Sequence, residues 1–346
     1  MTIYDLVTAP EIASYWEEMS EQRAPYFGEE LFPNQKKLGL TLSWLKGSAG
    51  LPVTLKLSAF DAKAVPRARI GFDKVTADMP FFKESMYIDE ELRQELNKVL
   101  ETGNQNYIDA IMNKVFNDQT VLVEAAAVAR ERMRMMLITT GTISMASNGQ
   151  NYNYDYGVAS SQKKNAATSW VTTTADIIGD IRSWQDAIED ATGVRPTRAV
   201  CDRKTWGYML KNVPIIKTIY ALSDGTNYLS TPRLRSYLLE ELELDVVVNS
   251  KKYKTETGTT TPYIPEDTFV MMPPGELGNT WFGTTPEESD LMSSNSVDNV
   301  AIVDTGVAVT TMRHSDPVNV ETKVTQICLP DFPVADQILI ADVTPA

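Results

Sequence analysis

"VFNDQTVLVEAAAVARERMRMMLITTGTI", residues 115–143, predicts the longest element of this chain. Together with the residues just before it, the stretch carries apolar side chains at steps of three, four or seven, the spacing of one helical face: Ile108, Ile111, Val115, Leu122, Ala126, Ala129, Met133 and Met136. Gly141 stands where a C-terminal helix cap belongs. We therefore predict one helix from Tyr107 to Thr139, which at 1.5 Å per residue is roughly 50 Å long.

Charged residues also occur near the end of this predicted helix. Arg134 follows Glu131 by three residues, so we interpret the two as an ordinary intrahelical ion pair that contributes little stability. The methionines of residues 131–137 are interpreted as core packing rather than as a cofactor pocket. A shorter, acidic helix is expected before the long one, from about Asp89 to Gly103.

The composition indicates a soluble, acidic protein with enough apolar residues, 43% of 346, for two or three lobes. The formal charge of −14 argues against a general nucleic-acid binder, because affinity for phosphate needs clustered Lys and Arg. No apolar run reaches the roughly 20 residues of a membrane span, and no secretory signal is expected at the start. Cys201 and Cys328 stand in apolar runs, so we expect buried thiols in a reducing cytoplasm.

Two segments precede the acidic helix. Residues 1–40 begin with an aromatic-rich arm that is too short to fold alone and is expected to lie on another part of the protein. Residues 41–84 contain two extended runs, 51–60 and 67–79, in which polar and apolar residues alternate as in a strand with one buried face. Pro66 marks the turn between the runs. We predict a long hairpin that projects from the body.

An α/β region follows the long helix. Residues 147–170 are polar and are expected to form a loop or a short hairpin. Helices are predicted after Thr173, where Asp176 completes a capping box, after Asp202 as an N-cap, and over 232–244. Gly193 is predicted to cap the first of these at its C-terminus. Buried strands are expected at the following ranges: 197–201, 245–250 and 267–274.

The C-terminal region is predicted to be almost entirely strand. Residues 318–329 and 337–343 are expected to pair with each other and to return under the long helix. The one histidine, His314, lies in a predicted strand beside Arg313, so we interpret it as a half-buried structural residue and not as a metal ligand.

Residue patterns typical of a catalytic, cofactor or metal site are missing from the sequence. It contains no glycine-rich phosphate loop, no Cys-x-x-Cys and no His-Glu-x-x-His. A series of carboxylates on one predicted helix is interpreted as a solvated face: Asp176, Asp180, Asp186, Glu189 and Asp190. The protein is therefore predicted not to be an enzyme and to need no cofactor.

The order of these parts resembles the major capsid proteins of tailed bacteriophages. It is similar above all to the capsid protein E family, which includes the phage lambda head protein. Four stretches carry the resemblance: 51–83 for an extended loop, 115–143 for a spine helix, 198–217 for a strand and helix of the axial domain, and 312–343 for the close. Each stretch alone is weakly specific, and the resemblance rests on their order and spacing.

The resemblance implies an α+β, HK97-like capsid fold. Its expected parts are an N-terminal arm over 1–40, an extended two-stranded loop over 41–84, a peripheral domain over 85–174 and 310–346, and an axial domain over 175–309. The peripheral domain would hold the spine helix and a long β-sheet. The implied function is that of the major capsid protein of a tailed phage or prophage, which self-assembles into hexamers and pentamers of an icosahedral shell.

The resemblance also implies partners and a location. The shell would enclose double-stranded DNA without sequence-specific binding, and it would assemble in the host cytoplasm and form the virion capsid. The segment before the loop is short, so a separate scaffolding protein is expected, together with a portal protein. Whether a decoration protein binds is left open, and no membrane partner is expected.

The loop is expected to contact a neighbouring subunit. Between residues 56 and 74 the acidic chain carries five bases against two acids, and the bases are the candidate interface residues: Lys56, Lys63, Arg67, Arg69 and Lys74. In related shells the loop lies over the adjacent peripheral domain, which makes the acidic helix a candidate acceptor through Asp89, Glu90, Glu91 and Glu95. The alternative is a hairpin that folds back on its own subunit.

Two other functions remain alternatives at this point. The first is an encapsulin-like bacterial nanocompartment shell, which would package cargo enzymes instead of a genome. The second is an enzyme built on the α/β region, against which the missing site motifs argue.

Overall fold

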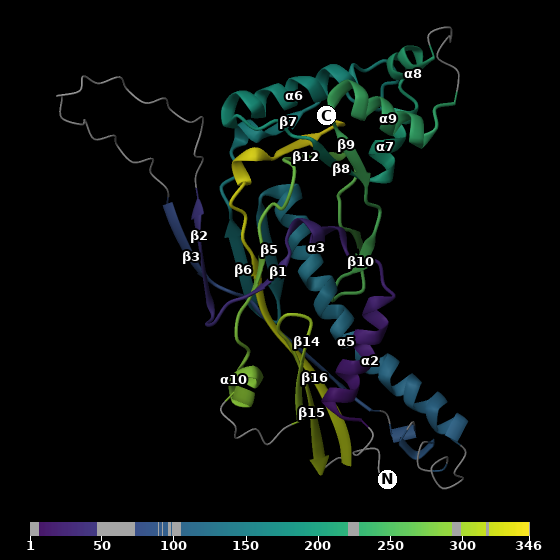
Figure 1. Ribbon diagram of the computed structural model, residues 1–346, viewed down its shortest axis with the longest axis vertical. Coiled ribbons are helices and arrows are strands. Elements are labelled where there is room, and N and C mark those ends of the chain that lie inside the picture. The colour runs from purple at the N-terminus through teal and green to yellow at the C-terminus, as the bar shows by residue number, and fades with distance from the viewer. Residues whose placement is uncertain are drawn as a thin grey trace, which may run out of the picture. The chain divides into compact units, whose positions relative to one another are not determined.

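A computed structural model describes residues 7–46, 73–88, 90–91, 93–95, 98, 105–220, 228–292, 299–315 and 318–345 (Figure 1). At 45–46, 73–75, 105–109 and 318 it describes the backbone alone. The chain forms two compact units, each made of three separate segments. The first unit comprises Met1–Leu42, Thr76–Met133 and Asn279–Asp331, and the second comprises Ser43–Val75, Arg134–Gly278 and Phe332–Ala346.

The longest element is helix α5, Gln105–Thr140, which confirms the helix predicted over 107–139. Gly141 ends it with a φ of +76°, and its N–H donates to Leu137 O at 2.9 Å. A Cβ at Gly141 would lie 2.5 Å from Val158 Cγ2, so both the backbone and the packing require glycine there. The methionines Met133 and Met135 are fully buried, as predicted.

The first unit is built on a six-stranded sheet around β16, Val318–Pro330. On one side β16 pairs antiparallel with β15, Val307–Ser315, which pairs in turn with β14, Asn299–Val303. On the other side it pairs first with β4, Phe81–Tyr87, and then with β13, Thr280–Phe282. Strand β1, Asn34–Lys36, adds to β13 in parallel.

Helix α5 packs against this sheet in the first unit. Gln326 Nε2 on β16 donates to Ala126 O on the helix at 3.0 Å. The predicted return of the C-terminal strand under the long helix is thus confirmed. The predicted pairing of 318–329 with 337–343 is wrong, because β17, Leu339–Asp342, belongs to the sheet of the second unit. Strand propensity identifies an extended segment but not its partner.

The N-terminal arm lies on its own unit. Helix α2, Ala9–Glu21, buries Ile12 and Trp16, and it contacts β14 and β15. Trp16 Nε1 donates to Asp304 Oδ1 at 3.1 Å, in the turn between those two strands. The short helices α3, Phe27–Leu31, and α10, Pro286–Met292, complete the described helices of this unit apart from residues 90–98.

The second unit has a five-stranded sheet with helices beside it (Figure 1). Its strands are β7 at Lys163–Asn165, β17, β12 at Thr268–Met272, β8 at Arg198–Cys201 and β9 at Asp245–Val248, in that order. Its helices are α6 at Ile177–Thr192, α7 at Arg203–Leu210, α8 at Val213–Ile219 and α9 at Thr231–Leu242. These elements confirm the predicted α/β region.

Most predicted helix ends of the second unit are confirmed. Asp202 caps α7 by accepting from Lys204 N and Thr205 N, both at 2.9 Å. Gly193 ends α6 with a φ of +76°. The predicted capping box is wrong in one respect, because Asp176 is itself the N-cap of α6 and accepts from Gly179 N at 2.9 Å. The buried core includes Trp170 stacked on Trp184, with ring centroids 5.8 Å apart.

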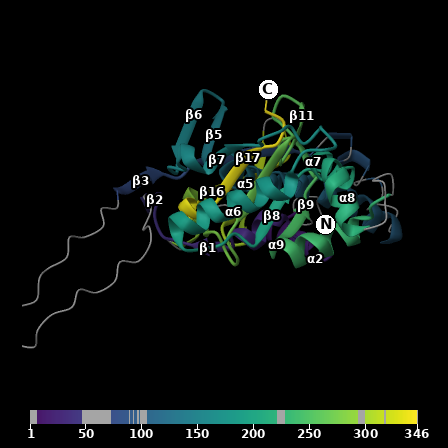
Figure 2. The ribbon, with the colours of Figure 1, turned by 90° about the horizontal axis from the view of Figure 1, so that it is seen from above.

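Three two-stranded sheets complete the described strands. β5, Thr142–Ser147, and β6, Gln150–Asp155, form a short hairpin that begins before the range of 147–170 predicted as a loop or short hairpin (Figure 2). Asn148 and Gly149 both have positive φ, as the tight turn between them requires. β10, Lys252–Lys254, pairs with β11, Thr260–Pro262, and β2, Thr41–Lys46, pairs with β3, Asp73–Asp78. Among the helices that the structure describes, none has the length and hydrophobicity needed to cross a bilayer.

Candidate interaction surfaces

The predicted loop is described only at its base. Strands β2 and β3 form that base, and Lys74 is a residue of β3 for which only the backbone is described. The other four candidate interface bases fall outside the described residues: Lys56, Lys63, Arg67 and Arg69.

Backbone hydrogen bonds hold the root of the loop to the first unit. Met79 N donates to Leu40 O at 2.9 Å, and Thr284 N donates to Gly39 O at 3.3 Å. Gly39 has a φ of +98°, which a glycine adopts without strain. Leu38 and Leu40 on either side of it are exposed. Strands β2 and β3 therefore lie next to a hydrogen-bonded turn at Gly39, and the apolar side chains on either side of this glycine are exposed to solvent.

The described acceptor residues Glu90, Glu91 and Glu95 are helical and exposed, whereas Asp89 lies outside the described residues. Arg93 binds both carboxylate oxygens of Glu90, each at 2.7 Å, and Gln94 donates to Glu90 at 3.1 Å. The hydrogen bond from Arg93 lowers the pKa of Glu90 below its ordinary value. Glu90 already has a cationic neighbour on its own helix, so it is a weaker candidate acceptor for a second base than the sequence indicated.

Three charged residues of α5 are buried: Arg130, Glu131 and Arg134. The predicted intrahelical pair of Glu131 and Arg134 therefore does not lie on an exposed helix face, which corrects its interpretation as an ordinary pair. Arg130 Nη2 lies 2.5 Å from Asp304 Oδ2, and Arg130 Nη1 donates to Gln326 Oε1 at 3.0 Å. Glu131 accepts from Gly28 N at 3.0 Å at the start of α3. These side chains connect the helix to the sheet and to the N-terminal arm. The sequence gives no sign of this, because Arg and Glu are commonest on exposed helix faces.

His314 lies on β15 as a half-buried partner of Glu321 on β16. Its Nε2 lies 2.6 Å from Glu321 Oε2. Burial opposes ionisation of Glu321, but hydrogen bonds from Ser85 and His314 hold the pKa of this carboxyl below its ordinary value. No group of three or more metal-ligating side chains occurs within the described ranges.

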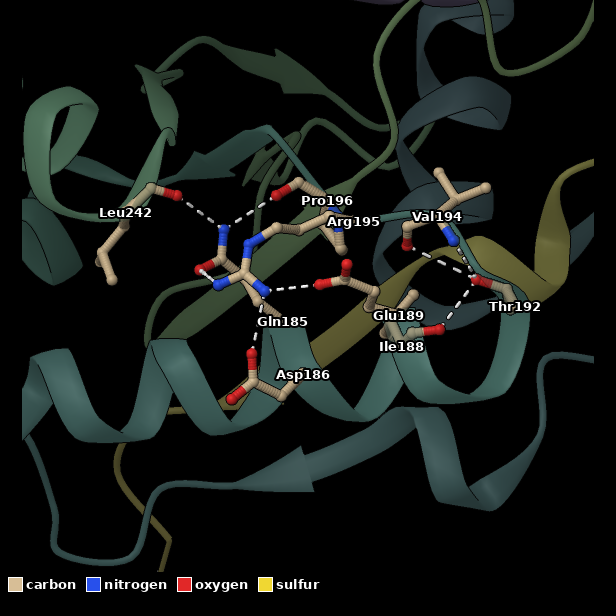
Figure 3. Close-up of polar contacts among 9 residues, drawn as sticks. All are labelled: Gln185, Asp186, Ile188, Glu189, Thr192, Val194, Arg195, Pro196 and Leu242. Atoms are coloured by element: carbon tan, nitrogen blue, oxygen red, sulfur yellow. Dashed lines mark hydrogen bonds and ion pairs between the residues drawn. The ribbon is translucent and has the colours of Figure 1, made fainter.

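The acidic face predicted for α6 is only partly solvated. Figure 3 shows Arg195 reaching back to α6, where it donates to Asp186 Oδ1 at 2.9 Å and to Glu189 Oε2 at 2.6 Å. Asp180 is buried and accepts from Trp170 Nε1 at 2.9 Å, so the solvated interpretation is wrong for this residue. The sequence pattern assigns Asp180 to the polar face of the helix, so it gives no sign of this buried structural role.

An open hollow of about 460 Å³ lies between α8 and α9 in the second unit. Tyr237 is among its lining residues, and burial raises the pKa of this phenol. A tyrosine shifted in that direction is a poorer general base. Burial likewise raises the pKa of the Cys201 thiol, so this cysteine is not a ready nucleophile. Both Cys201 and Cys328 are buried thiols, as predicted.

Comparison with known proteins shows which protein family this chain matches. The family model described as phage major capsid protein E matches residues 8–343. No curated protein matches the chain.

Solved structures with the same fold include three from bacteria and phages. A protein described as the capsid protein of a prophage of Escherichia coli CFT073 has a TM-score of 0.61 and 14% identity, over 97% of this chain and 99% of that one. A phage-related protein from Bordetella bronchiseptica RB50 has a TM-score of 0.59 and 12% identity, over 98% and 99%. The capsid asymmetric unit of cyanophage A-1(L) has a TM-score of 0.53 and 12% identity, over 92% of each chain.

Proposed function

Because the chain belongs to the phage major capsid protein E family, we propose that its copies form the hexamers and pentamers of an icosahedral shell around double-stranded DNA. Family and fold make it a structural capsid protein with an HK97-like fold, not an enzyme. The family match over residues 8–343 is the single observation that carries the proposal. It also favours the phage capsid over the nanocompartment shell, which was the alternative.

The proposed partners follow from the same assignment. A separate scaffolding protein would direct assembly in the host cytoplasm, and a portal protein would occupy one vertex of the shell. The charge of −14 supports contact with packaged DNA that is loose and without sequence specificity, since phosphate repels an acidic surface. Such a shell would hold the genome without binding it tightly.

The four-part division of the chain also stays a proposal. The arm over 1–40 and the peripheral parts over 85–174 and 310–346 are supported by helices α2 and α5 and the sheet of β16. The axial domain over 175–309 is supported up to Gly278 by the α/β elements of the second unit, whereas β13, α10 and β14 of this range belong to the first unit. The sheet of the second unit, however, also includes β7 and β17, from outside 175–309. The axial sheet would therefore include one strand from each of the two peripheral segments.

The extended loop is proposed to place its bases against the acidic helix of a neighbouring copy. Exposure of Glu91 and Glu95 supports this, and the hydrogen bonds of Glu90 to Arg93 make Glu90 a secondary acceptor. The exposed Leu38 and Leu40 at the loop's root supply apolar surface for the same contact.

Electron microscopy of the protein expressed with its scaffolding protein tests the proposed function. We expect closed empty shells of uniform size. A stable monomer or a small soluble oligomer at micromolar concentration would refute the assignment, and shells that enclose host enzymes would favour the nanocompartment. The protein without scaffold serves as the control, for which we expect fewer or aberrant particles.

A further inference from the structure

Strand β4 has one backbone edge without a partner among the residues that the structure describes. It pairs with β16 only, and Ile88 N donates to Val320 O at 3.1 Å just beyond its end. Hydrogen-bonded pairs alternate along antiparallel strands. Counting back from Ile88, the N–H and C=O groups that point away from β16 belong to Phe81, Lys83, Ser85 and Tyr87.

This free edge is poorly protected against another strand. Phe81 is 42% exposed and Tyr87 54% exposed, and Lys83 and Ser85 between them are also exposed. Soluble proteins usually guard an edge with several charges, a proline or a bulge, because open N–H and C=O groups recruit other strands. Among the four residues whose N–H and C=O groups face away from β16, only Lys83 is charged. The edge is therefore suited to be covered by a second chain.

The edge is also held in place before any partner arrives. Glu321 on β16 receives hydrogen bonds from Ser85 and Tyr87 on β4, and it bonds to His314 on the next strand. The ring centroids of Tyr87 and His314 lie 5.8 Å apart. A strand that is already straight and fastened loses little further freedom when a partner adds to it.

We propose that two copies of this protein join through antiparallel pairing of their β4 edges around a twofold axis, with Ser85 opposite Ser85 of the second copy. The inference rests on the proposed shell, since an icosahedral shell contains twofold axes and a twofold contact needs only one surface, used twice. Pairing would continue the sheet from one copy into the next and would cover the outward N–H and C=O groups of both edges.

Charge selects the register of this pairing. Three registers keep five or more residues of the seven-residue strand paired, with Lys83, Glu84 or Ser85 at the centre. The first two place Lys83 or Glu84 directly opposite the same residue of the second copy, and like charges opposite each other destabilise a sheet. The Ser85-centred register has no such pair. It places Lys83 opposite Tyr87 of the second copy, where the ammonium can contact the aromatic face.

The test is a disulfide cross-link in assembled shells of the full-length Ser85→Cys variant. Residues directly opposite in a hydrogen-bonded antiparallel pair have Cα atoms about 5.5 Å apart, within the range that a disulfide spans. The native cysteines, Cys201 and Cys328, are buried and give little background. The matched control is Glu84→Cys, one residue away, whose Cα would be more than about 7 Å from its equivalent in this register.

After mild oxidation and non-reducing electrophoresis, we expect a covalent dimer from Ser85→Cys shells and none from Glu84→Cys shells. A dimer from Glu84→Cys alone, or shells of both variants without any dimer, would overturn the proposal. Failure of the wild-type protein to form shells would instead refute the proposed function, so the two failures are distinguishable.

A second variant removes the need for cysteine chemistry. Proline is tolerated on an edge strand where the N–H faces outward, so Ser85→Pro should leave the subunit folded by circular dichroism. It removes a donor that the proposed pairing uses, and we expect loss of shells. Normal shells from a folded Ser85→Pro protein would overturn the proposal.

Discussion

Several buried polar groups of the second unit find partners close by within its own chain, whereas strand β4 of the first unit has an exposed backbone edge with no partner among the described residues. In the second unit, Asp176 and Asp202 cap helices, and Gln185 Nε2 donates to the carbonyls of Pro196 and Leu242 at 2.9 and 3.0 Å. In the first unit, β4 presents N–H and C=O groups that no described residue pairs with, beside exposed aromatic rings. The proposed joining of two copies would cover this edge.

The two units also differ in how they use buried charge. In the first unit, Arg130 joins helix, turn and strand through Asp304 and Gln326. In the second unit, Asp180 holds one tryptophan and one backbone N–H close to it in sequence, Trp170 Nε1 at 2.9 Å and Ala167 N at 3.3 Å. The first contact spans more than 170 positions and the second fewer than 15. The buried Arg130 therefore joins parts of the first unit that are distant in sequence, and the buried Asp180 supports a local part of the second.

Removing the long-range contact should have the largest effect. Arg130→Met leaves Asp304 and Gln326 without their cationic partner, and breaking a buried pair on one side costs roughly 3–5 kcal/mol. We expect a lower urea midpoint and loss of shells. The control is Arg182→Met, because Arg182 pairs with Glu241 where both side chains are nearly half exposed and about 0–1 kcal/mol is at stake. Equal effects of the two variants would contradict the difference in buried charge.

Breaking the local contact of the second unit should have a smaller effect. Asp180→Ala leaves the buried Trp170 N–H without an acceptor, which costs about 1–3 kcal/mol in unfolding free energy. Asp190→Ala on the same helix, α6, is the control, because Asp190 is exposed and surface substitutions usually change the unfolding free energy by no more than about 0.5 kcal/mol. Denaturant titration of both variants measures the difference. A neutral Asp180→Ala would restore the interpretation of this carboxylate as part of a solvated face.

Elements governed by local rules could be predicted from the sequence. The apolar spacing identified α5 within two residues at its start and one at its end, and Gly141, Gly193 and Asp202 marked helix ends correctly. Each of these features depends on a few adjacent residues and on backbone geometry that only some side chains allow. The partner of a strand depends on the whole fold, which is why 337–343 was assigned to the wrong sheet.

A smaller effect should come from two helix ends, which test whether the second unit is independent of assembly. Asp202→Ala loses an N-cap that accepts from two N–H groups, at roughly 0.5–2 kcal/mol. Gly193→Ala adds a Cβ at a φ of +76°, at roughly 1 kcal/mol or more. We expect both to lower the Tm while shells keep their geometry in electron micrographs. Unchanged Tm values for both would refute these local assignments.

The candidate surfaces were harder to predict than the fold. The bases of the loop stand out in the sequence because the rest of the chain is acidic, and their contact remains a proposal. The free edge of β4 was missed, since "FFKESMY" resembles any half-buried strand until its single partner is known. Aromatic residues at both ends of a short strand, Phe81 and Tyr87, on the same side of its alternation as Lys83 and Ser85, are the pattern that could have suggested an assembly surface.

The smallest effect per contact is expected where the bases of one copy would meet acids of the next. Arg67→Glu with Arg69→Glu should reduce shell yield and leave circular dichroism near that of the wild type, because the predicted hairpin would add little to the core of its own subunit. Each exposed pair contributes only about 0–1 kcal/mol. A shell repeats the contact in every subunit, however, and like charges placed opposite each other repel, so the losses accumulate.

Compensating changes identify the acceptor of these bases. Glu91→Lys with Glu95→Lys should restore part of the shell yield of the reversed loop, because both carboxylates are exposed on the acidic helix. Glu90→Lys should restore less, since Arg93 and Gln94 already hydrogen-bond to Glu90 and a lysine there would face Arg93. Yields are compared by sedimentation of shells from equal amounts of protein. An unfolded loop variant would place the hairpin in its own core, and normal shells would leave its charges as a solvated face that takes no part in assembly.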